Sequence, residues 1–323
     1  MPNYQGVWSL SEQYQNAGNW PAIYGGDIGA LQLGSSNGAV SSIDYINIAT
    51  SGNATSYGNL SAALTQRSSL GSATQGFFAG GQSPDTAGIE FLTFRSGGTT
   101  SSFGSLSSAS RIGTGASNST RGLFALGFSG ASRITTIDYV TMASAGDAQD
   151  FGDLTVARYG VMGGSSTTRA LFAGGNSSGG KTNVTDYVTI ASTGNALDFG
   201  DLTVSVDLGA TNGVCSSTRF VRMGGRLSSG QTNTIDYFTI ASTGNATDFG
   251  DLLFTLGEAP SGVSNSVTGL CSGGQSFTDG NSGQVNTIQS VTIASTGNAS
   301  DFGDLTVIAS SSSAASNAHG GLS

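Results

Sequence analysis

The amino-acid sequence predicts an all-β protein, a β-propeller of six blades with four strands in each blade. A fourteen-residue segment recurs almost unchanged, as TIASTGNALDFGDL, TIASTGNATDFGDL and TIASTGNASDFGDL at residues 189–202, 239–252 and 292–305. An aromatic-glycine dipeptide recurs six times, at intervals of 46, 48, 48, 50 and 53 residues. A period of roughly 40–50 residues with strand-like content is typical of propeller blades. The six copies are Tyr57-Gly58, Phe103-Gly104, Phe151-Gly152, Phe199-Gly200, Phe249-Gly250 and Phe302-Gly303.

Residues 154–202 show how the four strands of one blade are placed. Tyr159–Ser165 is a short strand of small residues, and Arg169–Gly175 is an apolar strand ended by a diglycine that suits a tight turn. Val184–Ala191 alternates β-branched or aromatic residues with polar ones, the period of two expected of a strand. After the turn STGN, Leu197–Leu202 is the fourth strand.

The recurring fourteen residues therefore cover the second half of strand 3, a Gly-Asn turn and strand 4. Such sameness is expected where every blade presents the same face to its neighbour. We expect the Phe of the DFGDL motif to pack between blades and its Gly to allow two backbones to approach closely.

The two ends of the chain are expected to close the ring in one shared blade. Residues 311–318 have the spacing of a first strand, but no second strand follows them. Residues 29–35 resemble a second strand and lead into the third-strand pattern of 43–49. The alternative is that residues 21–26 supply the first strand and the C-terminal strand packs elsewhere. The predicted domains are a leader at 1–20, which either covers the propeller or attaches it to a larger assembly, and the propeller at 21–323.

Composition argues against several classes of partner. The chain has 51 glycines, 10% charged residues and a net charge of −9, so it lacks the clustered cations that bind nucleic acid. It has neither a basic N-terminal region before Arg67 nor an apolar run of about 20 residues, which argues against membrane insertion. Two cysteines, Cys215 and Cys271, are too few for a disulfide framework and are expected to be unpaired and buried.

The sequence offers little for catalysis, and we expect no enzyme activity, cofactor or metal site. The only histidine, His319, excludes Ser-His-Asp triads and multi-histidine metal sites. Carboxylates recur instead of standing alone, so they are expected to cap turns and form salt bridges, with calcium binding and glycan cleavage by Asp198 and Asp201 as the weaker alternatives. The expected cationic partners are Arg121, Arg169 and Arg219. The carboxylates are the pairs Asp150/Asp153, Asp198/Asp201, Asp248/Asp251 and Asp301/Asp304, and the series Asp44, Asp138, Asp186 and Asp236.

The connection between strands 2 and 3 varies from unit to unit while the outer hairpin hardly changes. Variable loops on a rigid scaffold are where recognition usually occurs. We therefore name Phe128, Lys181, Arg226 and Phe277, in or beside these loops, as candidate binding residues for sugar rings or carboxylates; the simpler alternative is that the loops are merely solvated.

The diglycine after an aromatic strand (LFAGG, FFAGG, VRMGG) and the aromatic of the next strand (DY) resemble the kelch-type β-propeller, although DFGDL stands where a kelch repeat has Trp. The repeat, the leader from Gly6 to Pro21 and the segment SNAHGGL more closely resemble kelch-like repeat proteins of marine tailed bacteriophages. This resemblance implies a non-enzymatic virion protein of the particle surface, in a tail fibre, tail tip or capsid decoration. The implied partners are other virion proteins or host-surface glycan. The alternative function is that of a secreted or surface carbohydrate-binding lectin.

Overall fold

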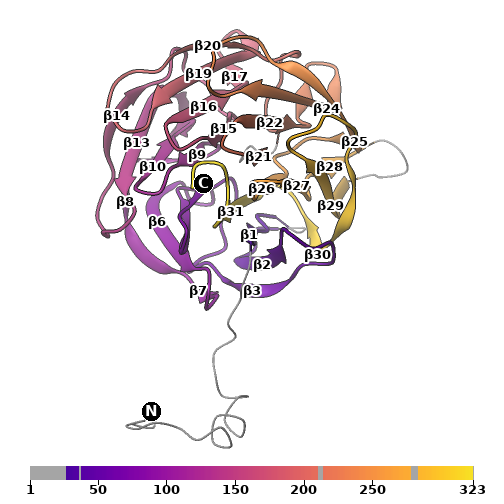
Figure 1. Ribbon diagram of the computed structural model, residues 1–323. Coiled ribbons are helices and arrows are strands. Elements are labelled where there is room, and N and C mark those ends of the chain that lie inside the picture. Colours follow the sequence, from indigo (N-terminus) through magenta and orange to yellow (C-terminus); the bar gives the residue numbers. More distant parts are fainter. Residues whose placement is uncertain (1–26, 36–37, 210–213, 278–282, 323) are drawn as a thin grey trace, which may run out of the picture.

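The computed structural model describes residues 27–35, 38–209, 214–277 and 283–322, and these form a ring of six antiparallel sheets without an α-helix (Figure 1). The six-bladed, all-β propeller predicted from the sequence is thereby confirmed. The predicted leader at 1–20 lies outside the described residues. So does the segment 21–26, the alternative first strand.

Each blade has four strands, which run in order from the axis of the ring to its rim. Blade 1 is β31 (Ser313–Ser316), β1 (Ile28–Gln32), β2 (Ser42–Asn47) and β3 (Thr55–Asn59); blade 2 is β4 (Ser68–Gly71), β5 (Gln75–Ala79), β6 (Thr86–Thr93) and β8 (Ser101–Ser110); blade 3 is β9 (Thr114–Ser117), β10 (Arg121–Ala125), β13 (Thr136–Thr141) and β14 (Gln149–Asp153); blade 4 is β15 (Met162–Ser165), β16 (Arg169–Ala173), β19 (Val184–Thr189) and β20 (Leu197–Asp201); blade 5 is β21 (Val214–Cys215), β22 (Arg219–Met223), β24 (Gly230–Thr239) and β25 (Thr247–Leu256); blade 6 is β26 (Ser261–Ser264), β27 (Thr268–Ser272), β29 (Gly283–Thr292) and β30 (Ser300–Ala309).

The two ends of the described chain share blade 1, as the sequence predicts. β31 pairs with β1 in antiparallel register, with Gly29 opposite Ser316 and Gln32 opposite Ser313. This pairing contradicts the alternative in which the C-terminal strand packs elsewhere. It also gives β1 a partner on both sides, so β1 is not left as an edge strand.

The second strand of each blade is buried on both faces because it lies between two neighbouring blades. In β16 the residues from Ala170 to Ala173 are all buried, whereas β19 buries Thr185, Asp186 and Val188 and leaves Val184 and Tyr187 half-buried. Because β16 is buried on both faces, its sequence is a continuous apolar run. The sequence of β19, which is buried only in part, alternates in part between apolar and polar residues.

A β-bulge shapes the DFGD motif. Ile137 pairs with Gly152 and Asp138 pairs with Asp150, so Phe151 is the extra residue in β14. The equivalent register shift occurs between strands 3 and 4 of all six blades. Phe151 is buried in a cluster with residues of blade 4, which confirms that this aromatic side chain packs between blades.

The repeated turn docks on the rim strand of the preceding blade. The Gly194 N–H donates to Phe151 O at 2.8 Å, the Ala196 N–H donates to Asp153 O at 2.8 Å, and Asn195 Oδ1 accepts from the Asp153 N–H at 3.1 Å. A Cβ atom on Gly152 would collide with the carbonyl oxygen of Gly194. At all six positions the repeated glycine lies so close to a neighbouring backbone that a Cβ atom would collide with it. The fourteen-residue segment is therefore nearly constant because the same contact between strands recurs around the ring. The six glycines are Gly58, Gly104, Gly152, Gly200, Gly250 and Gly303.

Candidate functional site

Four blades carry extra hairpins in the connection from strand 2 to strand 3, and we call this set the crown. Because these connections all leave the blades at the same end of the sheets, the crown occupies one face of the ring. Its elements are β11 (Phe128–Ser129) with β12 (Ser132–Arg133), β17 (Asn176–Ser177) with β18 (Gly180–Lys181), β23 (Arg226–Leu227) with the start of β24, and β28 (Gln275–Ser276) with the start of β29.

All four candidate binding residues belong to the crown, and the structure brings them to one face. Phe128 lies in β11, Lys181 in β18 and Arg226 in β23, and Phe277 directly follows β28. That they bind a ligand stays a prediction. Their surroundings differ greatly, and these surroundings show which side chains are available to a partner.

Phe128 is held within the protein by side chains of the crown and of the linkers between blades. Its ring stacks on Tyr159 with the centroids 4.6 Å apart and the planes inclined by 28°. The guanidinium carbons of Arg111 and Arg133 lie 5.3 and 5.6 Å from the ring centroid, within the range of cation–π contacts. Arg111 also pairs with Asp85 of blade 2. The half-buried Phe128 therefore joins neighbouring blades and presents only part of its surface.

Asp207 organises the two predicted cationic residues. This buried carboxylate lies 3.4 Å from Lys181 Nζ and 3.2 Å from Arg226 Nε. Lys181 also donates to Leu227 O at 2.6 Å, and Arg226 pairs with Glu258 at 2.6 Å. Reasoning from the sequence missed Asp207 because it lies in a linker, some 20 to 30 residues from the side chains that it holds.

Phe277 is the most available of the four residues. Its side chain is 62% exposed, and its backbone N–H donates to Gln231 Oε1 at 3.2 Å. A planar apolar ring held by its backbone and open to solvent is suited to stack on a sugar ring or on another protein.

The buried carboxylates of strand 3 have a structural role. In each blade one strand-3 side chain, a carboxylate in five blades and the amide of Gln289 in blade 6, accepts a hydrogen bond from a backbone N–H of the preceding blade, three residues after the repeated glycine. In blade 4, Asp186 accepts from the Thr155 N–H at 3.0 Å and from the Thr155 hydroxyl at 2.7 Å. The six pairs of acceptor and donor residue are Asp44 with Thr306, Glu90 with Ser61, Asp138 with Ser107, Asp186 with Thr155, Asp236 with Thr203 and Gln289 with Leu253.

For the aspartates and Gln289, the acceptor oxygens match the groups that the preceding blade donates. The four aspartates each face a Ser or Thr, which supplies both an N–H and a hydroxyl. Gln289 faces Leu253, which supplies the N–H alone, so the single carbonyl oxygen of the amide is sufficient. These side chains hold adjacent blades together.

The predicted salt-bridge partners are wrong. Arg121, Arg169 and Arg219 form no ion pair among the described residues; they donate to carbonyl oxygens of the next blade's outer hairpin, as Arg169 does to Ile240 O and Ala241 O at 3.0 Å. Each of the three also lies over a tyrosine ring of its own blade, at 4.5–4.9 Å from the centroid. The repeat period shows which side chains recur, but not which neighbour each one reaches across the ring.

Three other arginines, all fully buried, pair with the strand-3 acids. Arg67 lies 2.9 Å from Glu90, Arg158 lies 3.0 Å from Asp186, and Arg222 lies 2.5 Å from Asp236. Burial lowers the pKa of Arg67 and Arg158, and the neighbouring carboxylates partly offset this effect. A signal was present in the sequence, because the arginine in VRM interrupts an apolar strand where a lone charge would be costly.

In blades 1 and 3 no arginine of the described ranges pairs with the buried acid. Burial raises the pKa of Asp44 and of Asp138, and hydrogen bonds from Thr306 and Ser107 partly offset this effect. A raised pKa of this kind is often associated with catalysis. Here each carboxyl is enclosed between two blades with its acceptor atoms in use, so its chemistry is that of a buried hydrogen-bond acceptor.

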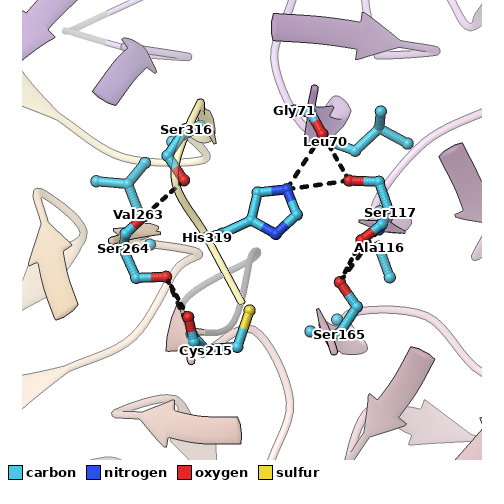
Figure 2. A pocket seen from close by; sticks show the side chains of 15 residues that line it. Leu70, Gly71, Ala116, Ser117, Ser165, Cys215, Val263, Ser264, Ser316 and His319 are labelled. Carbon is cyan, nitrogen blue, oxygen red and sulfur yellow. Dashed lines mark hydrogen bonds between the residues drawn. The ribbon is translucent and has the colours of Figure 1, made fainter. Parts of the chain in front are cut away.

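An axial channel runs along the inner strands. Serine hydroxyls at its wall donate to carbonyl oxygens of the preceding blade, as Ser165 Oγ does to Ser117 O at 2.7 Å and Ser264 Oγ to Cys215 O at 2.9 Å (Figure 2). After β31 the chain turns into the centre of the ring, where His319 lies among the wall residues (Figures 1 and 2). The remaining cavity of about 30 Å³ has room for one or two water molecules.

Both cysteines are free and buried, as the sequence predicts, with Cys215 in the channel wall and Cys271 in the core of the adjacent blade. Across the described ranges, no three His, Cys, Asp or Glu side chains are grouped to hold a metal ion. The described part of the chain also has no helix long and apolar enough to span a membrane. No protein-family model matches the chain, and no curated protein is significantly similar to it.

Proposed function

We propose that this protein is a non-enzymatic component of a phage virion, in which the propeller displays the crown to another virion subunit or to host-surface glycan. The observation that carries the proposal is the contrast between the two kinds of loop. The outer hairpins are nearly identical because they hold the blades together, whereas the crown hairpins differ in sequence and make their own contacts. Binding specificity is usually found in such loops on a rigid scaffold.

The charge of the crown differs from that of the whole chain. Arg111, Arg133, Lys181 and Arg226 are four of the eleven Lys and Arg residues of a protein with a net charge of −9. Arg111, Lys181 and Arg226 pair with carboxylates of the connections beside the crown, namely Asp85, Asp207 and Glu258. Among the described residues, the crown and the connections beside it therefore carry no excess of negative charge, so this face can approach an acidic glycan or an acidic protein without strong long-range repulsion.

A virion location is supported by the resemblance of the repeat to that of phage proteins, and it is tested by finding the chain in particles. Mass spectrometry of fractionated, purified virions, followed by imaging with an antibody against the propeller, locates it. Detection at the tail tip would support adhesion, and detection on the capsid would support decoration. Absence from particles would overturn the virion proposal.

The role of the crown is tested with two matched substitutions. Phe277 in the crown and Leu197 in an outer hairpin are large apolar residues, 62% and 60% exposed. Attachment is measured with the isolated propeller, either to host cells or to virions that lack this protein. Phe277→Glu is expected to weaken this attachment at least tenfold. Leu197→Glu is expected to leave attachment unchanged. Equal effects would contradict the crown as the contact surface.

The second candidate function is a carbohydrate-binding lectin that acts apart from a particle. The exposed ring of Phe277 favours this candidate, because aromatic rings stack on the apolar faces of sugars. A glycan array with the isolated protein tests it. Saccharide binding by a chain that is absent from virions would support the lectin over the virion component.

A further inference from the structure

Residues 317–322 close the axial channel from within. The Gly320 N–H donates to Cys215 O of blade 5 at 2.9 Å, and His319 Nε2 lies 3.1 Å from Gly71 O of blade 2 and 3.1 Å from Ser117 Oγ of blade 3. A Cβ atom on Gly321 would collide with Ser117 O, so the segment fits tightly. At its start, Asn317 exchanges hydrogen bonds with Ile28 of blade 1, at 3.2 and 2.7 Å. The segment thus contacts at least four blades and fills the space on the axis (Figure 2).

The hydrogen bonds of His319 define its protonation state. Nδ1 accepts from the backbone N–H of Gly321 at 3.1 Å, so this nitrogen carries no proton. Ser117 Oγ donates its own hydrogen to Gly71 O at 2.7 Å. The ring proton is therefore on Nε2, where it is donated to Gly71 O and Ser117 Oγ, and the docked imidazole is neutral.

Among the described residues, no carboxylate faces this imidazole. The Cys215 thiol is the one other titratable group that the described part of the chain places at the channel wall. Burial raises the pKa of this thiol, so it is neutral as well. The other described wall residues are glycines, serines and small or apolar side chains, none of which carries a charge. A proton added to Nδ1 would remove the bond from Gly321 and place an uncompensated charge in the channel.

We propose that residues 317–322 form a proton-released plug, in which protonation of His319 drives the segment out of the channel and exposes the serine-lined wall and Cys215. Release is local because β31, which precedes the plug, is anchored independently. It pairs with β1, and Ser316 Oγ donates to Ser264 O of blade 6 at 2.9 Å. The ring therefore stays closed when the plug leaves.

The direction of the pH dependence follows from burial. The pKa of docked His319 is lowered by burial from its ordinary value of 6.5, with a smaller opposing effect of the hydrogen bond with Gly71. Docking is thus fully favoured above pH 6.5 and weakens as the pH falls below it. Because one proton is taken up, the ratio of released to docked plug rises by at most about tenfold per pH unit.

The two cysteines provide the assay. The full chain is labelled with an activated pyridyl disulfide, which reacts with thiols at acidic pH, and the labelling rate of each cysteine is divided by its rate in the urea-unfolded chain at the same pH. Cys215 reports release of the plug, and Cys271, buried in the inter-blade core, reports opening of the ring. His319→Gln keeps a neutral N–H donor and cannot be protonated, so it is the matched variant.

The normalised Cys215 rate is expected to rise at least fivefold between pH 7.5 and pH 5.0 in the original sequence and to stay constant in His319→Gln, while Cys271 stays protected. A constant Cys215 rate in the original sequence would overturn the proposal. So would an equal rise in the Gln variant, or a rise of Cys271 in parallel with Cys215, which would show opening of the whole ring.

Discussion

The ion pair buried between Arg158 and Asp186 is expected to make blade 4 far more sensitive to loss of its carboxylate than blade 3. Asp186 and Asp138 occupy equivalent positions, both are fully buried, and each accepts an N–H and a hydroxyl from the preceding blade. They differ in the arginine, which only Asp186 contacts within the described residues. Asp186→Asn and Asp138→Asn therefore form a matched pair of nearly isosteric substitutions.

The expected magnitudes differ because of what each substitution leaves behind. Asp186→Asn leaves the Arg158 guanidinium buried without its counter-ion, and breaking a buried pair in this way costs about 3–5 kcal/mol. Asp138→Asn weakens the hydrogen bonds from Ser107 but removes a carboxylate that burial already disfavours, so its expected cost is about 1 kcal/mol. With an unfolding entropy of about 2.1 cal/mol/K per residue, the first loss lowers Tm by roughly 4–7 °C.

Thermal unfolding followed by circular dichroism measures both variants beside the original sequence. Arg158→Met with Asp186→Asn provides a further control, because removing both charges should recover part of the stability that Asp186→Asn loses. Equal losses of Tm in the two Asn variants would refute the reasoning. It would then follow that the carboxylate of Asp186 contributes little to stability through its ion pair with Arg158.

Three further outcomes are expected. Gly200→Ala should cost about 1–3 kcal/mol in urea unfolding, because φ is +143° and a Cβ would collide with Gly244 O. Gly179→Ala should cost little, because its Cβ would meet only Ser177 Oγ, at an ordinary contact distance of 3.7 Å. Burial raises the pKa of Asp44 and Asp138 above the ordinary 3.8, so these groups favour folding at low pH and lose that effect as the pH rises. The free energy of unfolding of the variant with Asn at both positions should therefore increase relative to that of the original sequence between pH 4 and pH 7. A difference that stays constant with pH would argue against this. Burial raises the pKa of Cys271 to about 12, so iodoacetamide at pH 8 should alkylate it only in the unfolded chain, as mass spectrometry of digests would show.

Much of the fold could be predicted from the sequence because its signal is local. The repeat interval, the apolar second strand and the incomplete first strand together predicted the six blades and their closure. The same local patterns could not identify ion-pair partners. Arg67, Arg158 and Arg222 occupy different positions in their repeats, yet each guanidinium reaches the equivalent buried acid.

The candidate site was predicted only in outline. Variation between repeats indicated the loops that hold Phe128, Lys181, Arg226 and Phe277, and the structure brings these to one face. It did not indicate that Asp207 would hold Lys181 and Arg226, since a linker carboxylate has no periodic signature. Of the four, only Phe277 is largely exposed.

The sequence by itself determined the architecture, because hydrophobic period and turn residues act over a few positions and each repeat encodes the same blade. Tertiary structure decided the contacts between blades, since these join residues that are far apart along the chain. His319 is the clearest case: a lone histidine has no catalytic partner in the sequence, but closure of the ring places it 3.1 Å from Gly71 O, some 248 residues away. Its chemistry depends on that enclosure, because desolvation in the channel, not any neighbouring motif, makes the charged imidazole unfavourable.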